Sequence, residues 1–158
     1  CRGCGFDAAM KRSIVTPTGT VTVSEEGGTL VALEWGGGFE GSSDLLCEAE
    51  RQIEAYFAGE RRVFELAVRV RGSQFQQDVC AVMGQIPFGE TVTYGEIAKQ
   101  LGVPAQAVGQ ACGGNPLPLI IPCHRVLGAQ GLGGFSGGVG VETKVWLLKH
   151  EGAAGLLI

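Results

Sequence analysis

The chain has 158 residues, a formal net charge of −4 and 45% hydrophobic residues. No apolar run reaches the roughly 20 residues of a membrane span, and the first residues lack the apolar stretch of a secretory signal. The acidic net charge weighs against an extensive nucleic-acid-binding surface, because phosphate contacts supply most of the affinity there. We therefore expect one or two small domains in a soluble, cytoplasmic protein, which would be associated with the nucleoid in a bacterium.

Six cysteines in a chain of this length favour free thiols in a reducing compartment over a disulfide framework. Cys1 and Cys4 form one Cys-x-x-Cys pair, but a zinc site needs two further ligands and the chain has only two histidines. We therefore predict neither a metal nor another cofactor. Met10 looks like a natural start, so residues 1–9 are left out of the predicted fold.

Residues 10–71 have the pattern of a small α/β domain. The two turns between its first three predicted strands contain glycines, which is typical of hairpins. Ser43 can cap the helix that follows, whose apolar residues recur at helical spacing. We find no candidate chemistry in this domain and interpret it as a scaffold. The predicted elements are strands over 13–15, 20–24, 29–35 and 64–70, and a helix from Asp44 to about Gly59.

Residues 72–158 are predicted to form a second, mainly helical domain. It is nearly neutral, with 4 Lys and Arg residues against 5 Asp and Glu residues. Two capping boxes, Ser73 with Gln76 and Thr93 with Glu96, predict two helix starts. Gly102 can end the second of these helices, and Pro104 can open a third that runs to about Cys112. The last two helices have the dimensions of a helix-turn-helix, although a plain αα-hairpin fits their spacing equally well.

The third helix of this domain has an unusual surface made of alanine and glycine, with Gln106 and Gln110 as its only long polar side chains. Helices that read the major groove of DNA normally present long polar side chains to base edges. Small residues suit close packing instead, either against another helix or in a minor groove that is entered without sequence readout. The small residues are Ala105, Ala107, Gly109, Ala111 and Gly113.

Residues 115–126 read Asn-Pro-Leu-Pro-Leu-Ile-Ile-Pro-Cys-His-Arg-Val. Because three prolines fix φ and remove backbone donors, we expect a stiff, extended segment rather than a helix or a central strand. It carries Cys123 inward with His124 and Arg125 directly behind it. Cationic neighbours lower a thiol pKa, which indicates a reactive cysteine. A packed structural thiol is the alternative.

A glycine-rich stretch follows over 128–140, and its backbone could approach a ligand closely. Phe135 and Ser136 are its candidate contact residues. A final helix is predicted over 142–150. Glu151 directly after it could orient an imidazole or could simply be solvated.

Residues 115–126 resemble the active-site signature of the O6-alkylguanine-DNA alkyltransferases. The resemblance covers residues 73–152, and the N-terminal domain matches that family only in its ribonuclease H-like outline. It implies an α/β protein with a small ribonuclease H-like domain and a C-terminal domain of the winged helix-turn-helix kind. Further matching segments are Phe75-Gln76, 86–98, Ala107-Val108-Gly109, 135–138 and 146–152.

The resemblance also implies a role for individual residues. Cys123 would accept the alkyl group, and His124 would act as its base through a water molecule. Glu151 would orient the imidazole, Asn115 would brace the turn before the cysteine, and Tyr94 would help to rotate the base and polarise it. DNA contacts would come from Ala105, Gln106, Ala107, Tyr94 and Arg125, and contacts to the alkylated base from Pro118, Val126, Phe135 and Ser136.

The implied activity is direct repair of O6-alkylguanine, and also of O4-alkylthymine, in double-stranded DNA by a monomer. An S-alkyl cysteine is a poor leaving group, so each molecule would react once. Gln106 stands where the family usually has an arginine that fills the gap left by the flipped base, and Phe135 stands where it usually has a tyrosine. The alternatives are a lesion-binding sensor that does not react and a Cys-His acyl hydrolase that turns over.

Overall fold

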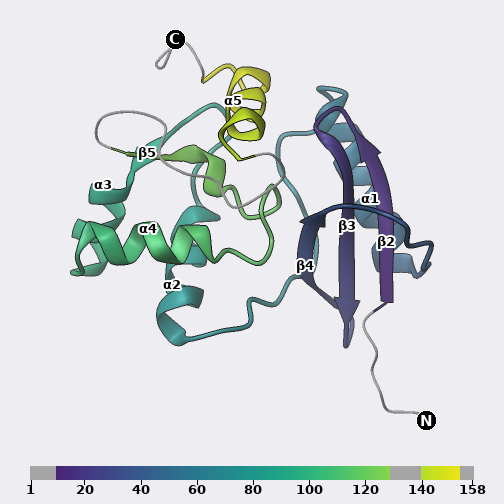
Figure 1. The fold of residues 1–158 in the computed structure, drawn as a ribbon, viewed down its shortest axis with the longest axis horizontal. Coiled ribbons are helices and arrows are strands. Elements are labelled where there is room, and N and C mark those ends of the chain that lie inside the picture. Colours follow the sequence, from purple (N-terminus) through teal and green to yellow (C-terminus); the bar gives the residue numbers. More distant parts are fainter. Residues whose placement is uncertain (1–9, 129–139, 154–158) are drawn as a thin grey trace. The chain divides into compact units, whose positions relative to one another are not determined.

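The computed structural model describes residues 10–128 and 140–153, and the chain divides into two compact units on either side of the bond between Arg69 and Val70. The first unit contains a three-stranded antiparallel sheet in the order β2-β3-β4. Helix α1 (Asp44–Phe57) packs against β2 and β3 on one face of this sheet (Figure 1). The strands are β2 (Met10–Thr16), β3 (Gly19–Glu26) and β4 (Thr29–Trp35).

The two faces of β3 explain why this short sheet is stable. Val21 and Val23 point into the core and have no exposed surface, as expected for a strand packed against a helix. Thr22 on the other face is also buried. Its hydroxyl donates a hydrogen bond of 2.7 Å to the carbonyl of Gly36 in the loop after β4, which satisfies this buried polar group. The helix begins as predicted, since the Ser43 hydroxyl accepts a hydrogen bond from the amide of Leu46.

The strand predicted over 64–70 is wrong. Only Val68 forms a bridge, to Leu30 of β4, and the rest of the segment has no regular structure. Two backbone hydrogen bonds hold it there, from Leu30 N to the carbonyl of Ala67 and from Arg69 N to the carbonyl of Leu30. Part of the segment bonds to a side chain instead, because the Glu65 amide donates to Gln52 on α1.

The second unit is mainly helical, as predicted. Helices α3 and α4 pack against each other and are joined by three residues, and α4 also packs on α2 (Figure 1). A two-stranded parallel sheet pairs β5 with β6. The elements are α2 (Gln74–Met83), β5 (Val92–Thr93), α3 (Tyr94–Leu101), α4 (Ala105–Gly113), the 3-10 turn η1 (Cys123–Arg125), β6 (Val126–Leu127) and α5 (Val141–His150).

The helix caps largely follow the sequence. Thr93 and Glu96 form the complete capping box at the start of α3, and Gly102 ends this helix in the left-handed conformation with a φ of 70°. At α2 only half of the predicted box forms. Ser73 accepts from the amide of Gln76, but the Gln76 side chain donates to the carbonyl of Ala111 and so ties α2 to α4.

Within the two described stretches, no helix combines the length and apolar character that a bilayer crossing requires. All four cysteines in this part of the chain are free thiols, and its histidine, cysteine and carboxylate side chains form no group of three that could hold a metal ion. Cys1 and Cys4 lie outside it. The four free thiols are Cys47, Cys80, Cys112 and Cys123.

Candidate active site

Cys123 is the first residue of the turn η1 and is only 4% exposed. The sequence predicted an extended segment here, and this is wrong. Leu119 has a φ of 76°, the Ile121 amide bonds back to the carbonyl of Leu117, and residues 123–125 form a 3-10 turn. The prolines limit the conformations on either side of these turns, but they do not keep the chain straight. As a result, Cys123 and His124 are not forced to opposite sides of the backbone.

Asn115 holds the turn that precedes the cysteine. Its side-chain nitrogen donates to the carbonyl of Ile121 over 2.9 Å, and its side-chain oxygen accepts from the amide of Leu117 over 3.0 Å. Both backbone groups are buried. Without this side chain the Leu117 amide would lose this acceptor at a cost of about 1–3 kcal/mol, whereas the Ile121 carbonyl would keep the hydrogen bond from the Cys123 amide. The Asn115 side chain therefore links the backbone at Leu117 to the backbone at Ile121.

His124, Arg125 and Glu151 form a buried cluster. The His124 ring nitrogen Nε2 lies 2.7 Å from Glu151 Oε2, and neither side chain has exposed surface. Arg125 binds the same carboxylate through two of its nitrogens, Nε at 2.8 Å and Nη2 at 2.9 Å. A solvated Glu151 is therefore wrong, because the carboxylate sits between a histidine and an arginine.

The segment over 86–89 supports this cluster from the other side. The Ile86 carbonyl accepts from Arg125 Nη1 over 2.6 Å, and the Phe88 ring lies 5.8 Å from the guanidinium carbon. Gly89 has a φ of 86°, and a side-chain carbon there would come within 3.2 Å of the carbonyl of Glu151. A larger residue at 89 would be strained and would push against the end of α5, which explains the glycine.

The protonation of His124 follows from these contacts. Burial lowers the pKa of His124, while the hydrogen bond and charge of Glu151 act in the opposite direction. A carboxylate only accepts hydrogen bonds, so the proton of a neutral ring is on Nε2, which donates to Glu151. The other nitrogen, Nδ1, is buried and forms no hydrogen bond within the described residues. Its lone pair is therefore available to accept a proton.

Tyr94 and Val126 are brought to the same region by the short parallel sheet. Val92 pairs with Val126, and Tyr94 follows β5 as the first residue of α3. Lys144 of α5 joins them: its Nζ donates to the carbonyl of Val126 over 2.7 Å and lies 5.9 Å from the centre of the Tyr94 ring. Residues from α3, α5 and the stretch after Pro122 thus meet around Cys123 and Val126.

Two family comparisons cover almost all of the described chain. Residues 74–153 match the family described as 6-O-methylguanine DNA methyltransferase, DNA binding domain, and residues 10–70 match its ribonuclease-like domain. The chain belongs to the 6-O-methylguanine DNA methyltransferase family. The family resemblance stated from the sequence is confirmed.

Curated relatives and solved structures agree with the family match. The chain is similar to the methylated-DNA–protein-cysteine methyltransferase of Methanosarcina acetivorans, with 50% identity over 115 residues that cover 71% of this chain and 72% of the relative. The Mycobacterium bovis protein of the same name is 42% identical over 158 residues, covering 89% of this chain and 90% of the relative.

The crystal structure of Mycobacterium tuberculosis OGT in complex with DNA matches with a TM-score of 0.82 at 41% identity, covering 91% of this chain and 93% of that one. These matches confirm the predicted α/β fold class, with a ribonuclease-like domain followed by a winged helix-turn-helix-like domain.

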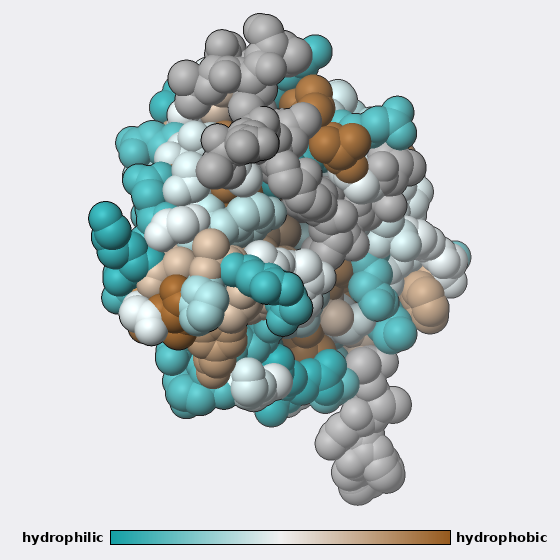
Figure 2. All heavy atoms as spheres, turned by 60° about the vertical axis from the view of Figure 1, so that its left-hand side comes forward, coloured by the Kyte–Doolittle hydropathy of each residue, from teal (hydrophilic) through white to brown (hydrophobic). Residues whose placement is uncertain are grey.

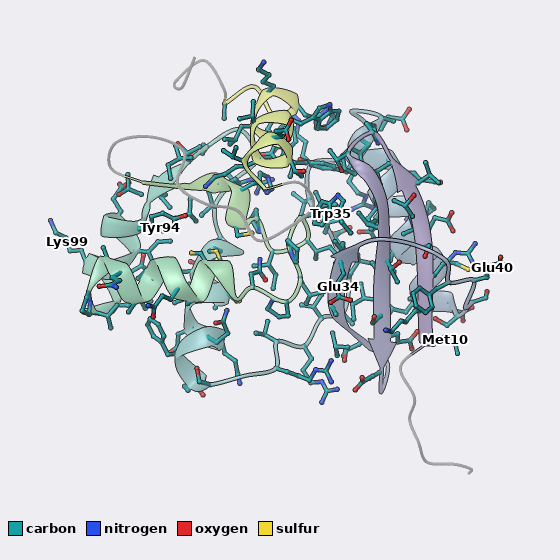
Figure 3. The ribbon with its side chains drawn as sticks, in the orientation of Figure 1. Met10, Glu34, Trp35, Glu40, Tyr94 and Lys99 are labelled. Atoms are coloured by element: carbon teal, nitrogen blue, oxygen red, sulfur yellow. The ribbon has the colours of Figure 1, made fainter. Side chains whose placement is uncertain are left out.

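The residues of the second unit that are predicted to contact DNA differ in their exposure. Ala105 and Gln106 are exposed at the start of α4, and Ala107 is half-buried. Hydrophilic and hydrophobic side chains are interspersed on the face seen in Figure 2. Figure 3 shows Lys99 projecting away from α3, and this residue is exposed. It is one of the few accessible basic side chains in this unit.

The prediction that Arg125 contacts DNA is corrected by the structure. The residue is 7% exposed, and Nε, Nη1 and Nη2 are all engaged in hydrogen bonds within the unit. Exposing this guanidinium would take two hydrogen bonds and a counter-charge away from the buried Glu151 carboxylate, which is costly. Arg125 is a structural partner of Glu151.

Two of the four residues predicted to hold the base lie in the described part of the chain. Val126 and Pro118 are buried beside the cysteine turn, and Pro118 forms a bridge with Ile121. The Val126 carbonyl already accepts from Lys144, and a carbonyl oxygen can accept a second hydrogen bond. Phe135 and Ser136 lie outside the described residues.

Lys144 was not recognised from the sequence. It has no exposed surface, although it lies on α5 only five positions before the exposed Lys149. A helical pattern could have found it: Thr143, Lys144, Leu147 and Leu148 are the buried residues of this helix, so Lys144 stands at a core position.

Proposed function

We propose that this chain repairs O6-alkylguanine in double-stranded DNA, and O4-alkylthymine as well, by transferring the alkyl group to Cys123. The observation that carries the proposal is the buried His124–Glu151 pair beside Cys123, with a lone pair left on His124 Nδ1. The relatives are named for methyl transfer to a protein cysteine, and one solved relative is bound to DNA. Both points support the proposal.

In this mechanism, His124 removes the proton of the Cys123 thiol. The Glu151 carboxylate keeps the Nε2 proton in place, so Nδ1 receives the thiol proton, through a water molecule where the two atoms do not meet. An ordinary thiol, with a pKa of about 8.5, is only a few per cent ionised at neutral pH, so ionisation supplies at most about a 30-fold gain in rate. Positioning of the alkyl carbon for in-line attack supplies the rest.

The transfer step balances without an added cofactor. The Cys123 sulfur forms a bond to the alkyl carbon as the bond from this carbon to O6 breaks, and the electron pair stays on guanine. The thiol proton, held on His124, then passes to the guanine ring. The product is a thioether, which does not hydrolyse readily, so we expect one reaction per protein molecule.

A base inside a duplex hides its O6 alkyl carbon, so the alkylated base has to be flipped out of the stack. We assign minor-groove contact to Ala105, Gln106 and Ala107 on α4, and rotation and polarisation of the base to Tyr94. The Val126 carbonyl, together with Ser136, would hold the guanine edge. In this assignment residues 72–158 bind DNA and transfer the group, and residues 10–71 are scaffold.

The proposal also includes the oligomeric state and the cellular location of the protein. It includes action as a monomer. The free thiols Cys47, Cys80 and Cys112, together with a nucleophile that must stay reduced, support a reducing compartment such as the cytoplasm.

Intact-mass measurement after incubation with O6-methylguanine DNA tests the proposal. We expect one stable added methyl group, located on Cys123 by peptide sequencing. A lesion-binding sensor would gain none, and a Cys-His acyl hydrolase would carry none at steady state. Either of these results, with a binding-competent protein, contradicts the proposed function.

A further inference from the structure

Helix α4 ends without a left-handed glycine. Gly114 follows its last residue with a φ of −94°, whereas Gly102 at the end of α3 has a φ of 70°. The last carbonyls of a helix have no partner within the helix and need one from elsewhere. The Gly114 amide meets part of this need by donating to the carbonyls of Gln110 and Ala111 over 3.0 and 3.1 Å. A side chain from another helix supplies a further donor.

That side chain is Gln76 of α2. Its Nε2 donates to the Ala111 carbonyl over 2.8 Å, so it caps the end of α4 from a different helix. The same nitrogen carries a second hydrogen and donates to the sulfur of Cys80 over 3.5 Å. Gly114 leaves room for this carboxamide, because a side-chain carbon at this position would lie 3.3 Å from Gln76 Oε1.

Cys80 connects Gln76 to Asn115. The thiol is buried, and burial raises its pKa, so it is protonated at neutral pH and can act as a donor. Its sulfur donates to Asn115 Oδ1 over 3.9 Å, which is a weak hydrogen bond between two buried groups. Two side chains one turn apart on α2 therefore reach the last turn of α4 and the asparagine just beyond this helix.

The Asn115 side chain joins these contacts to the cysteine turn. Its amide holds the backbone at Leu117 and Ile121, and the Cys123 amide donates to the Ile121 carbonyl over 2.8 Å. The place of this side chain depends on where α4 ends and on what contacts Oδ1. A continuous series of hydrogen bonds thus runs from Gln76 on α2 to the backbone of Cys123.

We propose that Gln76 is a positioning residue of the transfer site, which caps α4 from α2 and, together with Cys80, holds Asn115 against the turn that carries Cys123. The purpose of this arrangement rests on the proposed function, whereas the hydrogen bonds concern the fold of the second unit alone. Gln76 acts through Asn115 and not on the reacting atoms. Without its donor the cysteine turn is held less firmly, so Cys123 is less often placed for in-line attack.

The first test measures single-turnover transfer from free O6-methylguanine base and from duplex DNA that carries this lesion. Gln76→Met keeps the length of the side chain but removes the donor. Gln76→Lys keeps a donor, and a cation is favourable at the C-terminal end of a helix. Gln77→Met is the matched control, since Gln77 is exposed on the same helix and donates to the carbonyl of Gly72. Thermal unfolding confirms that each variant is folded.

We expect Gln76→Met to slow transfer about tenfold on both substrates, Gln76→Lys to stay within about threefold of the wild type, and the control to match it. Transfer from the free base slows as well, because the turn itself is disturbed and not only DNA binding. Gln76→Met at the wild-type rate would overturn the inference. Slowing confined to duplex DNA, or Gln76→Lys no faster than Gln76→Met, would overturn it as well.

A double-mutant cycle tests whether Gln76 acts through Asn115. Asn115→Ala removes the amide on which the effect depends. Gln76→Met should therefore slow transfer in the wild type but hardly further in the Asn115→Ala background. If Gln76 only stabilised the fold, the additional slowing would be the same in both backgrounds, and this result would contradict the inference.

Hydrogen exchange of the Leu117 amide tests the arrangement without any transfer reaction. This amide donates to Asn115 Oδ1, so its exchange rate measured by NMR reports how firmly the asparagine is held. Relative to the amides of α1 in the first unit, we expect Gln76→Met to speed this exchange at least about fivefold and Gln77→Met to leave it unchanged. If the wild type transfers no methyl group, the proposed function fails, and this exchange still decides the role of Gln76. An unchanged exchange rate would overturn the inference even if the protein repairs DNA.

Discussion

His124 and Glu151 lie 27 positions apart in the chain, yet they meet at 2.7 Å with neither side chain exposed. The same carboxylate accepts two hydrogen bonds from Arg125, whose third nitrogen binds the carbonyl of Ile86. One carboxylate therefore does two things. It fixes the tautomer of the proposed base, and it neutralises an arginine that ties the cysteine turn to the segment over 86–89.

Glu151→Gln tests both roles. The substitution keeps the size of the side chain but leaves the Arg125 guanidinium buried without a counter-charge, so we expect a loss of about 3 kcal/mol in the free energy of unfolding. It also replaces the charged acceptor of the Nε2 proton with a neutral amide, which stabilises a protonated His124 less, so we expect transfer to slow at least about tenfold. Urea denaturation and single-turnover rates give the two values.

Glu142→Gln, in the exposed first turn of the same helix, is the matched control and should change neither value appreciably. If the two variants behave alike, the buried cluster contributes neither stability nor reactivity.

Local signals in the sequence were sufficient to predict the helices whose ends are fixed by residues close in the chain. The capping box at Thr93 and the glycine at 102 define α3 without reference to the rest of the fold. The prediction failed at 64–70, where β-rich residues form only a bridge. It failed there because a strand needs a partner along its length, and this segment gives part of its backbone bonding to Gln52.

The candidate site was predictable in its residue types but not in its geometry. Cys123, His124 and Glu151 were identified by pattern and resemblance. The burial of Arg125 was not predicted, because it involves a contact with Ile86, 39 positions away. Lys144 was missed because a lysine on a helix is usually exposed. The helical spacing of Thr143, Lys144, Leu147 and Leu148 could have indicated a core position, and the structure shows that Lys144 is buried there.

The burial of Lys144 also predicts a pH dependence of stability. Its pKa is about 8 in the folded chain, against 10.5 for an ordinary lysine, so between these values the unfolded chain binds more protons. The burial cost is therefore fully present below about pH 8 and is removed as the pH rises through this window. We expect the free energy of unfolding of the wild type, measured relative to Lys144→Met, to increase between about pH 8 and 10.5. Urea denaturation across this range checks it, and a difference that stays constant with pH would contradict it.

Gln106 is exposed at the start of α4, where the family usually carries an arginine. A glutamine can bond to the orphaned partner base but offers no planar cation to stack in the gap. Gln106→Arg should therefore tighten binding to alkylated duplex DNA by about 1 kcal/mol, roughly fivefold, since stacking on a base is worth about 1–3 kcal/mol. Reaction with the free alkylated base, which needs no flipping, should hardly change. Equal effects on the second-order rates for duplex and free base would place Gln106 away from the gap.

The second unit offers few accessible cations to DNA phosphates. Arg125 and Lys144 are buried, whereas Arg71, Lys99 and Lys149 are exposed. Each phosphate contact contributes about −0.9 to the slope of log K against log salt, so we expect a slope of about −2 to −4. Fluorescence anisotropy over a range of salt concentrations measures it. A slope near about −8 would require a basic surface that these residues do not form.

The stoichiometry of repair tests the central claim most directly. Wild-type protein is incubated with an excess of duplex DNA carrying O6-methylguanine, and repaired lesions are counted per protein molecule, with folded Cys123→Ala as the control. We expect the count to stop at one for the wild type and at zero for the variant, because the methyl group remains on Cys123 as a thioether. Repair of several lesions per molecule, or activity that survives Cys123→Ala, would contradict the account.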